Sequence, residues 1–210
     1  MTTLAILQGL GIGFAIAAPV GPIGMLCIRR TLHHGPVVGV ATGLGAATAD
    51  AMYGLVAAGG LRIAGWLLGH AAILSLVGAA LLAWLGVDSL RAFLRKARAS
   101  ASPQPDTAVP RPSPHAAFAS TFALTASNPA TILSFVGVIA ALGASVATGG
   151  NAAWWLVVGV FAGSTLWWLI LVTIVRLVHH AISPAALRWI DLATAAVLLG
   201  TAGWVAARAL

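Results

Sequence analysis

The sequence predicts an all-α integral membrane protein with six transmembrane helices, arranged as two inverted three-helix repeats with a broken first helix in each half. Three observations predict this fold. First, 60% of the 210 residues are apolar and only 7% are charged, whereas a soluble domain is about 25% charged. Second, six nearly uncharged runs are long enough to cross a bilayer. Third, prolines interrupt the first run of each half.

The six runs have the length that a helix needs to cross the hydrocarbon core, about 20 residues. No alternating strand pattern competes with them, and a backbone that faces lipid must satisfy its own hydrogen bonds, which favours helices. The runs cover residues 4–28, 37–60, 66–87, 116–142, 152–175 and 187–207.

A proline-rich segment divides the runs into two groups of three. Residues 99–115 contain five of the ten prolines, which predicts an extended linker and not a helix. We therefore expect a first three-helix repeat over residues 1–98 and a second over residues 116–210. Because each repeat has an odd number of crossings, the second must lie upside down in the membrane relative to the first.

The basic residues predict the orientation. Nine of the eleven Lys and Arg residues fall in the loops after the first, third and fifth runs, and only Arg62 and Arg208 fall on the other side. Cytoplasmic loops carry such an excess. We expect a multi-pass protein of the bacterial inner membrane, with a cytoplasmic linker and both termini outside. The same bias accounts for the net charge of +7 without a nucleic-acid partner.

The helix breaks predict a binding site. Pro19, Gly21 and Pro22 lie inside the first run, and Asn128 and Pro129 inside the fourth. A helix that restarts after a break presents unpaired N–H groups and a positive dipole end, which suit a carboxylate. The carbonyl groups before each break suit an ammonium group or a cation, and Asn128 offers a donor and an acceptor. The alternative is a pair of kinks that serve only packing.

Asp50 is an acid in the middle of an apolar run, with no basic residue among its helical neighbours. A charge in hydrocarbon costs several kcal/mol, so Asp50 should face the interior of the bundle. It is a candidate site for a proton or for a cationic group of the substrate, or else a neutral structural residue. Ser164 and Thr165 hold the matching place in the fifth run, so the charge is not repeated.

Two further aspartates lie near predicted cytoplasmic ends. Asp88 precedes Arg91 by three residues, and Asp191 follows Arg188 by three. Side chains with this spacing meet on a helix surface, so local ion pairing accounts for both.

Other motifs are less specific. The single Cys27 excludes an internal disulfide, a Cys-based metal cluster and the paired-cysteine chemistry of membrane electron carriers. No Ser, His and Asp set lies at one depth, so we expect no enzyme and no cofactor. Glycine pairs such as Gly39–Gly43 and Gly159–Gly163 permit close helix approach, within the chain or in a homodimer.

Four stretches resemble the lysine exporter (LysE/RhtB) family of amino-acid exporters. Residues 18–55 are similar to its Pro-Gly-Pro break, basic turn and second span ending in Asp, and residues 122–135 to its Asn-Pro motif. Residues 77–92 and 188–204 resemble its third and last spans. In this chain the first motif reads Pro-Val-Gly-Pro. The residues carried over by motif are Pro19, Gly21, Pro22, Asp50, Asn128 and Pro129.

The resemblance implies a secondary active transporter that exports amino acids or similar zwitterions across the inner membrane. Export would be coupled to a proton gradient or to the membrane potential, with Asp50 as the candidate for proton coupling. The alternative is a metal-cation exporter of the same superfamily, which would need more oxygen ligands than Asp50, Asn128 and backbone carbonyls.

Overall fold

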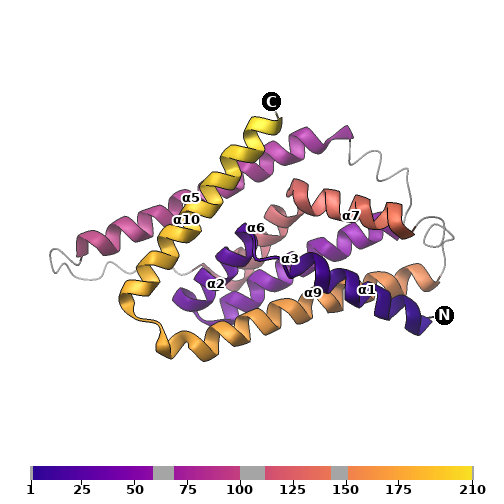
Figure 1. Cartoon of the computed structure of the whole chain (residues 1–210), viewed down its shortest axis with the longest axis horizontal. Helices are drawn as coiled ribbons and strands as arrows, with labels where there is room; N and C mark the ends of the chain where they lie inside the picture. Colours follow the sequence, from indigo (N-terminus) through magenta and orange to yellow (C-terminus); the bar gives the residue numbers. More distant parts are fainter. Residues whose placement is uncertain (1, 59–68, 100–111, 143–150, 210) are drawn as a thin grey trace.

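A computed structural model describes residues 2–58, 69–99, 112–142 and 151–209. All regular structure in this part of the chain is helical, as predicted (Figure 1). In chain order the elements are α1 (Thr2–Ala17), α2 (Pro22–His34), α3 (Pro36–Ala58), α5 (Ala71–Ala99), α6 (Pro114–Ala126), α7 (Pro129–Leu142), α9 (Asn151–Val178), the short 3-10 helix η1 (His179–Ala181) and α10 (Pro184–Ala209).

Three of the described helices, α5, α9 and α10, are long and apolar enough to cross a membrane. A fourth crossing is counted if α1 and α2 form one span, although the chain bends by 81° between them. Helix α3 is not among them, because Gly, Thr and Asp50 lower its mean hydropathy. Most of its central residues are buried, and a helix enclosed by other helices favours small residues at its contacts.

Several helix bounds differ from the expected ones. Helix α5 continues to Ala99, past the expected end at residue 87, because Leu, Ala, Arg and Lys remain good helix formers after hydropathy has fallen. Helix α6 begins at Pro114, inside the expected linker, since Ser113 accepts a hydrogen bond from the Ala116 N–H at 3.2 Å and proline suits the first helical position. Residues 100–111 of that linker lie outside the described residues.

Helices α1 and α9 run parallel and pack through glycines. Gly9 and Gly13 of α1 face the carbonyl groups of Leu156 and Val160 so closely that an added Cβ would collide with them. Gly159 and Gly163 of α9 face the carbonyls of Ile6 and Leu10 in the same way. The sequence pointed to the pair in α9 as a packing motif, and the structure shows that its partner is a second glycine pair, in α1.

The other main contacts centre on α3. Helix α6 runs parallel to α3, where Gly45 faces the Phe118 carbonyl, and α9 runs antiparallel to it, where Gly43 faces Trp168. Helices α5 and α10 form a separate antiparallel pair, visible as two crossing helices in Figure 1. Helix α3 therefore lies at the centre, and α2 connects it with the α5–α10 pair.

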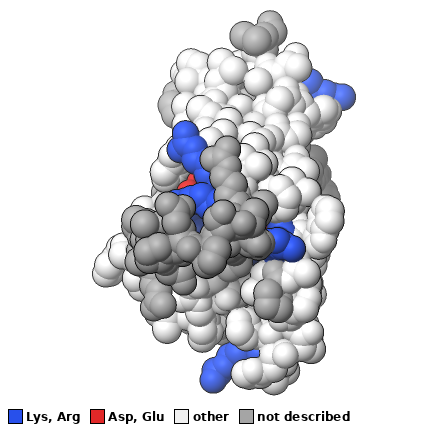
Figure 2. All heavy atoms as spheres, turned by 90° about the vertical axis from the view of Figure 1, so that its left-hand side faces the viewer, with Lys and Arg blue, Asp and Glu red and all other residues white. Residues whose placement is uncertain are grey.

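Basic side chains collect at one end of the molecule. The end at the left of Figure 1 contains the last turns of α5 and α9 and the first turn of α10. Figure 2 looks onto this end and shows Lys and Arg side chains spread over it. The described helices contribute Arg91, Arg95, Arg176 and Arg188 to these turns.

The glycine contact predicts a matched pair of substitutions in α1. Gly13→Ala should lower the melting temperature of the purified protein, because its Cβ meets the Val160 backbone, which cannot rotate away. Overpacking of this kind costs about 1–3 kcal/mol. Gly11→Ala should leave stability unchanged or raise it slightly, because nothing lies within 4 Å of that position and Ala favours helix by up to about 1 kcal/mol. Equal melting temperatures for the two variants would contradict the packing.

Candidate functional site

The first helix break leaves backbone donors at the start of α2 without a side-chain cap. Gly21 occupies the N-cap position and has no side chain that could cap the helix. Pro22, the next residue, has no N–H. The first helical hydrogen bond runs from the Met25 N–H to the Gly21 carbonyl at 3.0 Å. The N–H groups of Ile23 and Gly24 therefore lie ahead of the first hydrogen-bonded turn, where a helix can bind an anion.

The second break, between α6 and α7, is capped differently. The Asn128 Oδ1 accepts a hydrogen bond from the Ala130 N–H at 3.1 Å, and the Asn128 carbonyl accepts one from the Ile132 N–H at 3.1 Å. The amide oxygen of Asn128, expected to be offered to a ligand, is thus engaged by α7. Pro129 has no N–H. In the first turn of α7, the Thr131 N–H is therefore a backbone donor that neither hydrogen bond to Asn128 satisfies.

Tyr53 satisfies the carbonyl group that the second break exposes. Its hydroxyl donates to the carbonyl of Ala126, the last residue of α6, and its ring stacks on Phe135 of α7 at 5.5 Å between centroids. The Ala126 carbonyl, one of those expected to suit an ammonium group, therefore already accepts a hydrogen bond from within the protein. The sequence analysis missed this role. The available signal was the position of Tyr53, the only tyrosine, three residues after Asp50 on the same helix.

Asp50 faces the interior of the bundle, as predicted, and is 3% exposed. Its carboxylate accepts a hydrogen bond from the Ser164 hydroxyl of α9 at 2.6 Å. The Trp168 indole N–H in turn donates to that hydroxyl at 3.2 Å. Ser164, which the sequence analysis named as the counterpart of Asp50 in the fifth run, thus contacts it directly, and Trp168 orients the hydroxyl.

Both breaks and Asp50 line one cavity of about 210 Å³. Five predicted site residues lie in its wall, and the sixth, Pro129, lines a neighbouring cavity. No Lys or Arg from the described part of the chain lines the larger cavity, so Asp50 is the only charged group in that wall. The lining residues are Ile16, Ala17, Pro19, Gly21, Pro22, Ile23, Gly24, Ala46, Asp50, Thr125, Asn128, Ala130, Thr131, Ser134 and Trp168.

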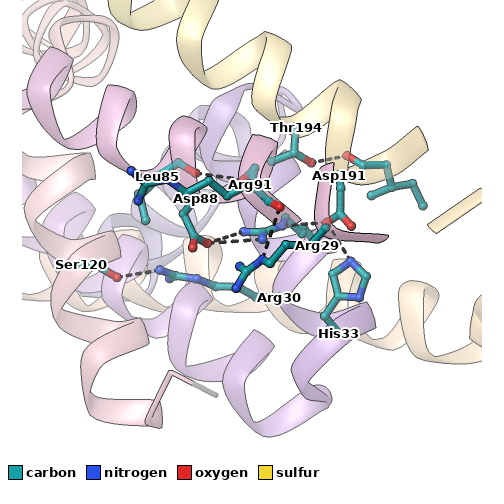
Figure 3. Close-up of polar contacts among 12 residues, drawn as sticks. Arg29, Arg30, His33, Leu85, Asp88, Arg91, Ser120, Asp191 and Thr194 are labelled. Atoms are coloured by element: carbon teal, nitrogen blue, oxygen red, sulfur yellow. Dashed lines mark hydrogen bonds and ion pairs between the residues drawn. The ribbon is translucent and has the colours of Figure 1, made fainter. Parts of the chain in front are cut away.

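Beyond the cavity, Arg29 joins α2 to α5 and α10 (Figure 3). Its Nε donates to the Asp191 carboxylate at 2.9 Å, and its terminal nitrogens lie 3.3 Å from the Asp88 carboxylate. The Nε2 of His33 lies 2.8 Å from the same Asp191 oxygen. Sequence spacing suggested local partners for both acids. The structure places the guanidinium of a third helix between them, which helical spacing cannot reveal.

Arg30, the next residue, joins α2 to the opposite side of the bundle. It donates to the Ser120 hydroxyl at 2.9 Å, the Thr121 hydroxyl at 3.0 Å and the Ala117 carbonyl at 3.1 Å, all on α6. It also lies 3.3 Å from the Thr42 hydroxyl of α3. Two adjacent arginines therefore fix α2 between two pairs of helices, directly after the helix turn that lines the cavity.

The described residues contain no group of three or more His, Cys, Asp or Glu side chains that could hold a metal ion. Within that part of the chain, the metal-cation alternative has Asp50 as its one ionisable ligand in the cavity. Cys27 is buried and its thiol lies 3.6 Å from the Gly39 carbonyl.

Comparison with known proteins identifies the family. The family model described as "LysE type translocator" matches residues 14–208, which include both helix breaks and Asp50. No curated protein and no solved structure matches the chain. The resemblance drawn from the motifs is confirmed, and the apolar helices agree with a translocator in a membrane. The chain is a multi-pass membrane protein that belongs to the LysE type translocator family.

Proposed function

We propose that this protein is a secondary active transporter that exports amino acids or similar small zwitterions across the bacterial inner membrane. One observation carries the proposal: a buried carboxylate and the N-terminal turns of two helices, the first of them without a side-chain cap, line the same cavity. A drug-sized ligand fills a pocket of about 300–1,000 Å³, so a cavity of about 210 Å³ suits a smaller solute.

The wall of the cavity offers complementary groups for a zwitterion. The Asp50 carboxylate suits an ammonium group, and Ser164 holds it in place through the 2.6 Å hydrogen bond. The N–H groups of Ile23 and Gly24 on α2, and of Thr131 on α7, suit a carboxylate, because helix N-termini carry partial positive charge. The cargo is thus recognised by backbone groups that exist only because both helices are broken.

The helix contacts support two inverted three-helix repeats over residues 1–98 and 116–210. If α1–α2 corresponds to α6–α7, α3 to α9 and α5 to α10, each main contact has a counterpart. The parallel pair α1 and α9 corresponds to the parallel pair α6 and α3, while α3–α9 and α5–α10 each join corresponding helices in antiparallel fashion. In this arrangement the six helical units cross the membrane and the two broken ones meet at its middle.

The basic end of the molecule in Figure 2 is the cytoplasmic end in this proposal, following the rule that cytoplasmic loops are positively charged. Both termini then lie outside. Helix α2 separates the cavity from the cytoplasm, held by Arg29 on one side and Arg30 on the other. Cargo can enter from the cytoplasm only when α2 moves, which requires these contacts to open.

Coupling to a proton or to the membrane potential would supply the energy. A charge that crosses the membrane contributes about 2.3 kcal/mol per 100 mV. At that potential one coupled proton supports a gradient of about fifty-fold. Asp50 is the candidate to carry the proton, since it is the one acid in the described wall of the cavity.

Asp50→Asn tests the proposal in liposomes that contain the full-length protein. Two assays with labelled amino acids separate the roles: exchange without a gradient, and accumulation under an imposed pH gradient. If Asp50 carries the proton, accumulation is lost while exchange persists. If it binds the ammonium group, both fall roughly ten- to hundred-fold, because a hydrogen bond to a charged group contributes about 1.5–3 kcal/mol.

Thr165→Val is the matched control for this experiment, because Thr165 neighbours Ser164 but does not line the cavity. Its rates should stay near those of wild type. A wild-type protein that moves no amino acid, or an Asp50→Asn variant that transports and couples normally, would overturn the proposal. Metal uptake by the same liposomes would favour the metal-cation alternative instead.

The contacts of Arg29 predict a graded effect on closure at the cytoplasmic end. With Cys27 replaced by Ala, a cysteine at Ala46 in the cavity wall reports access for a membrane-impermeant thiol reagent added from the cytoplasmic side. Asp191→Asn should raise the labelling rate several-fold, because its carboxylate is fully buried at 2.9 Å from Arg29. Asp88→Asn should raise it less, because that side chain is 51% exposed and lies at 3.3 Å.

Arg95→Gln serves as the control for closure, since Arg95 is exposed and donates a hydrogen bond to the Arg91 carbonyl of its own helix. Size-exclusion chromatography of each variant checks folding, because breaking a buried ion pair can cost about 3–5 kcal/mol. Folded variants that all label at the wild-type rate would show that the Arg29 cluster does not close the cytoplasmic end.

A further inference from the structure

A second, smaller cavity adjoins the candidate site. Its volume is about 90 Å³, and four residues line both cavities: Pro22, Ile23, Asn128 and Ala130. These four residues belong to the two helix breaks. The start of α2 and the start of α7 therefore form a common wall, with Asp50 on one side and the smaller cavity on the other.

The smaller cavity differs from the larger one in chemistry. Helices α5, α6 and α10 contribute Leu82, Leu124 and Val205, all at least nine-tenths buried, to its walls. The described residues that line it include no Asp, Glu, Lys or Arg. The hydroxyl of Ser127 is turned back to its own helix, where it donates to the Ala123 carbonyl at 2.6 Å. An apolar group would be accommodated here at little cost in desolvation.

The order of these features along the wall matches the three substituents of an α-amino acid. The ammonium group belongs beside Asp50, in the larger cavity. The carboxylate belongs at the N–H groups of Ile23 and its neighbours, in the common wall. The smaller cavity then lies beside the third substituent of the α-carbon, next to the four residues that line both cavities.

We propose that the smaller cavity is the side-chain subsite of the transporter and selects amino acids with short, uncharged aliphatic side chains. This inference rests on the proposed function, since it assigns the cargo of the same site. A cationic side chain would enter a chamber without a counter-charge, and a glycine would leave the chamber unfilled. Each methylene that such a pocket accepts or rejects changes specificity by about 10- to 200-fold.

Thr201 of α10 is a position at which the smaller cavity can be altered alone, because it lines that cavity and not the larger one. Thr201→Leu would fill part of the chamber from a position that does not line the larger cavity with Asp50. Val205→Ala would enlarge the chamber at the next helical turn. The two changes should shift the preference for cargo size in opposite directions.

The test measures exchange of labelled glycine, alanine, valine, leucine and lysine in liposomes containing the full-length protein. Wild type should exchange valine or leucine at least tenfold faster than glycine or lysine. Thr201→Leu should lower the ratio of leucine to alanine exchange at least tenfold, and Val205→Ala should raise the ratio of leucine to valine exchange. Gly200→Ala is the matched control, because nothing lies within 4 Å of that position and it does not line the cavity.

The possible failures are distinguishable. If wild type exchanges amino acids but Thr201→Leu slows all of them equally, or if lysine is preferred, the subsite is wrong while the proposed function stands. If wild type exchanges no amino acid, the proposed function and the subsite both fall. Size-exclusion profiles that match wild type ensure that a changed ratio is not caused by misfolding.

Discussion

The structure depends on one constraint: a helix that is interrupted in an apolar environment must find partners for the backbone groups that the interruption frees. The two breaks meet this constraint in different ways. At the second break, the Tyr53 hydroxyl donates a hydrogen bond to the Ala126 carbonyl, and the Asn128 side chain caps α7. At the first, Gly21 supplies no side-chain cap. The residues that carry the uncapped donors, Ile23, Gly24 and Thr131, line the cavity between the breaks, where a solute can replace a cap.

Close packing of glycines is what brings the two breaks together. Gly13 and Gly163 allow α1 and α9 to approach until backbone meets backbone, and Gly45 does the same for α3 and α6. Each of these contacts joins a helix that ends at a break to a helix of the opposite half. If larger residues held these helices apart, the starts of α2 and α7 would not share a wall, and Asp50 would lose the hydrogen bond from Ser164.

The charged side chains also need partners when they are buried. Arg29 is paired with Asp88 and Asp191, and Asp191 is fully buried with Arg29 and His33 against it. Arg30 is buried too, and neutral acceptors on α3 and α6 take its hydrogen bonds. Asp50 has no such ionic partner among the residues that line its cavity. An acid held by neutral hydrogen-bond donors can respond to a proton or a cation far more readily than one that is bound in an ion pair.

The sequence by itself determined the helical membrane class, the positions of both breaks, the burial of Asp50 and the family, because hydropathy, proline and an isolated charge act locally along the chain. The expected bounds of the last two runs also lie within a few residues of those of α9 and α10. Only the tertiary structure decided the 81° turn at the first break, the Tyr53 bond to Ala126, and the place of Arg29 between Asp88 and Asp191. These features depend on which helices become neighbours, and periodicity within a helix does not contain that information.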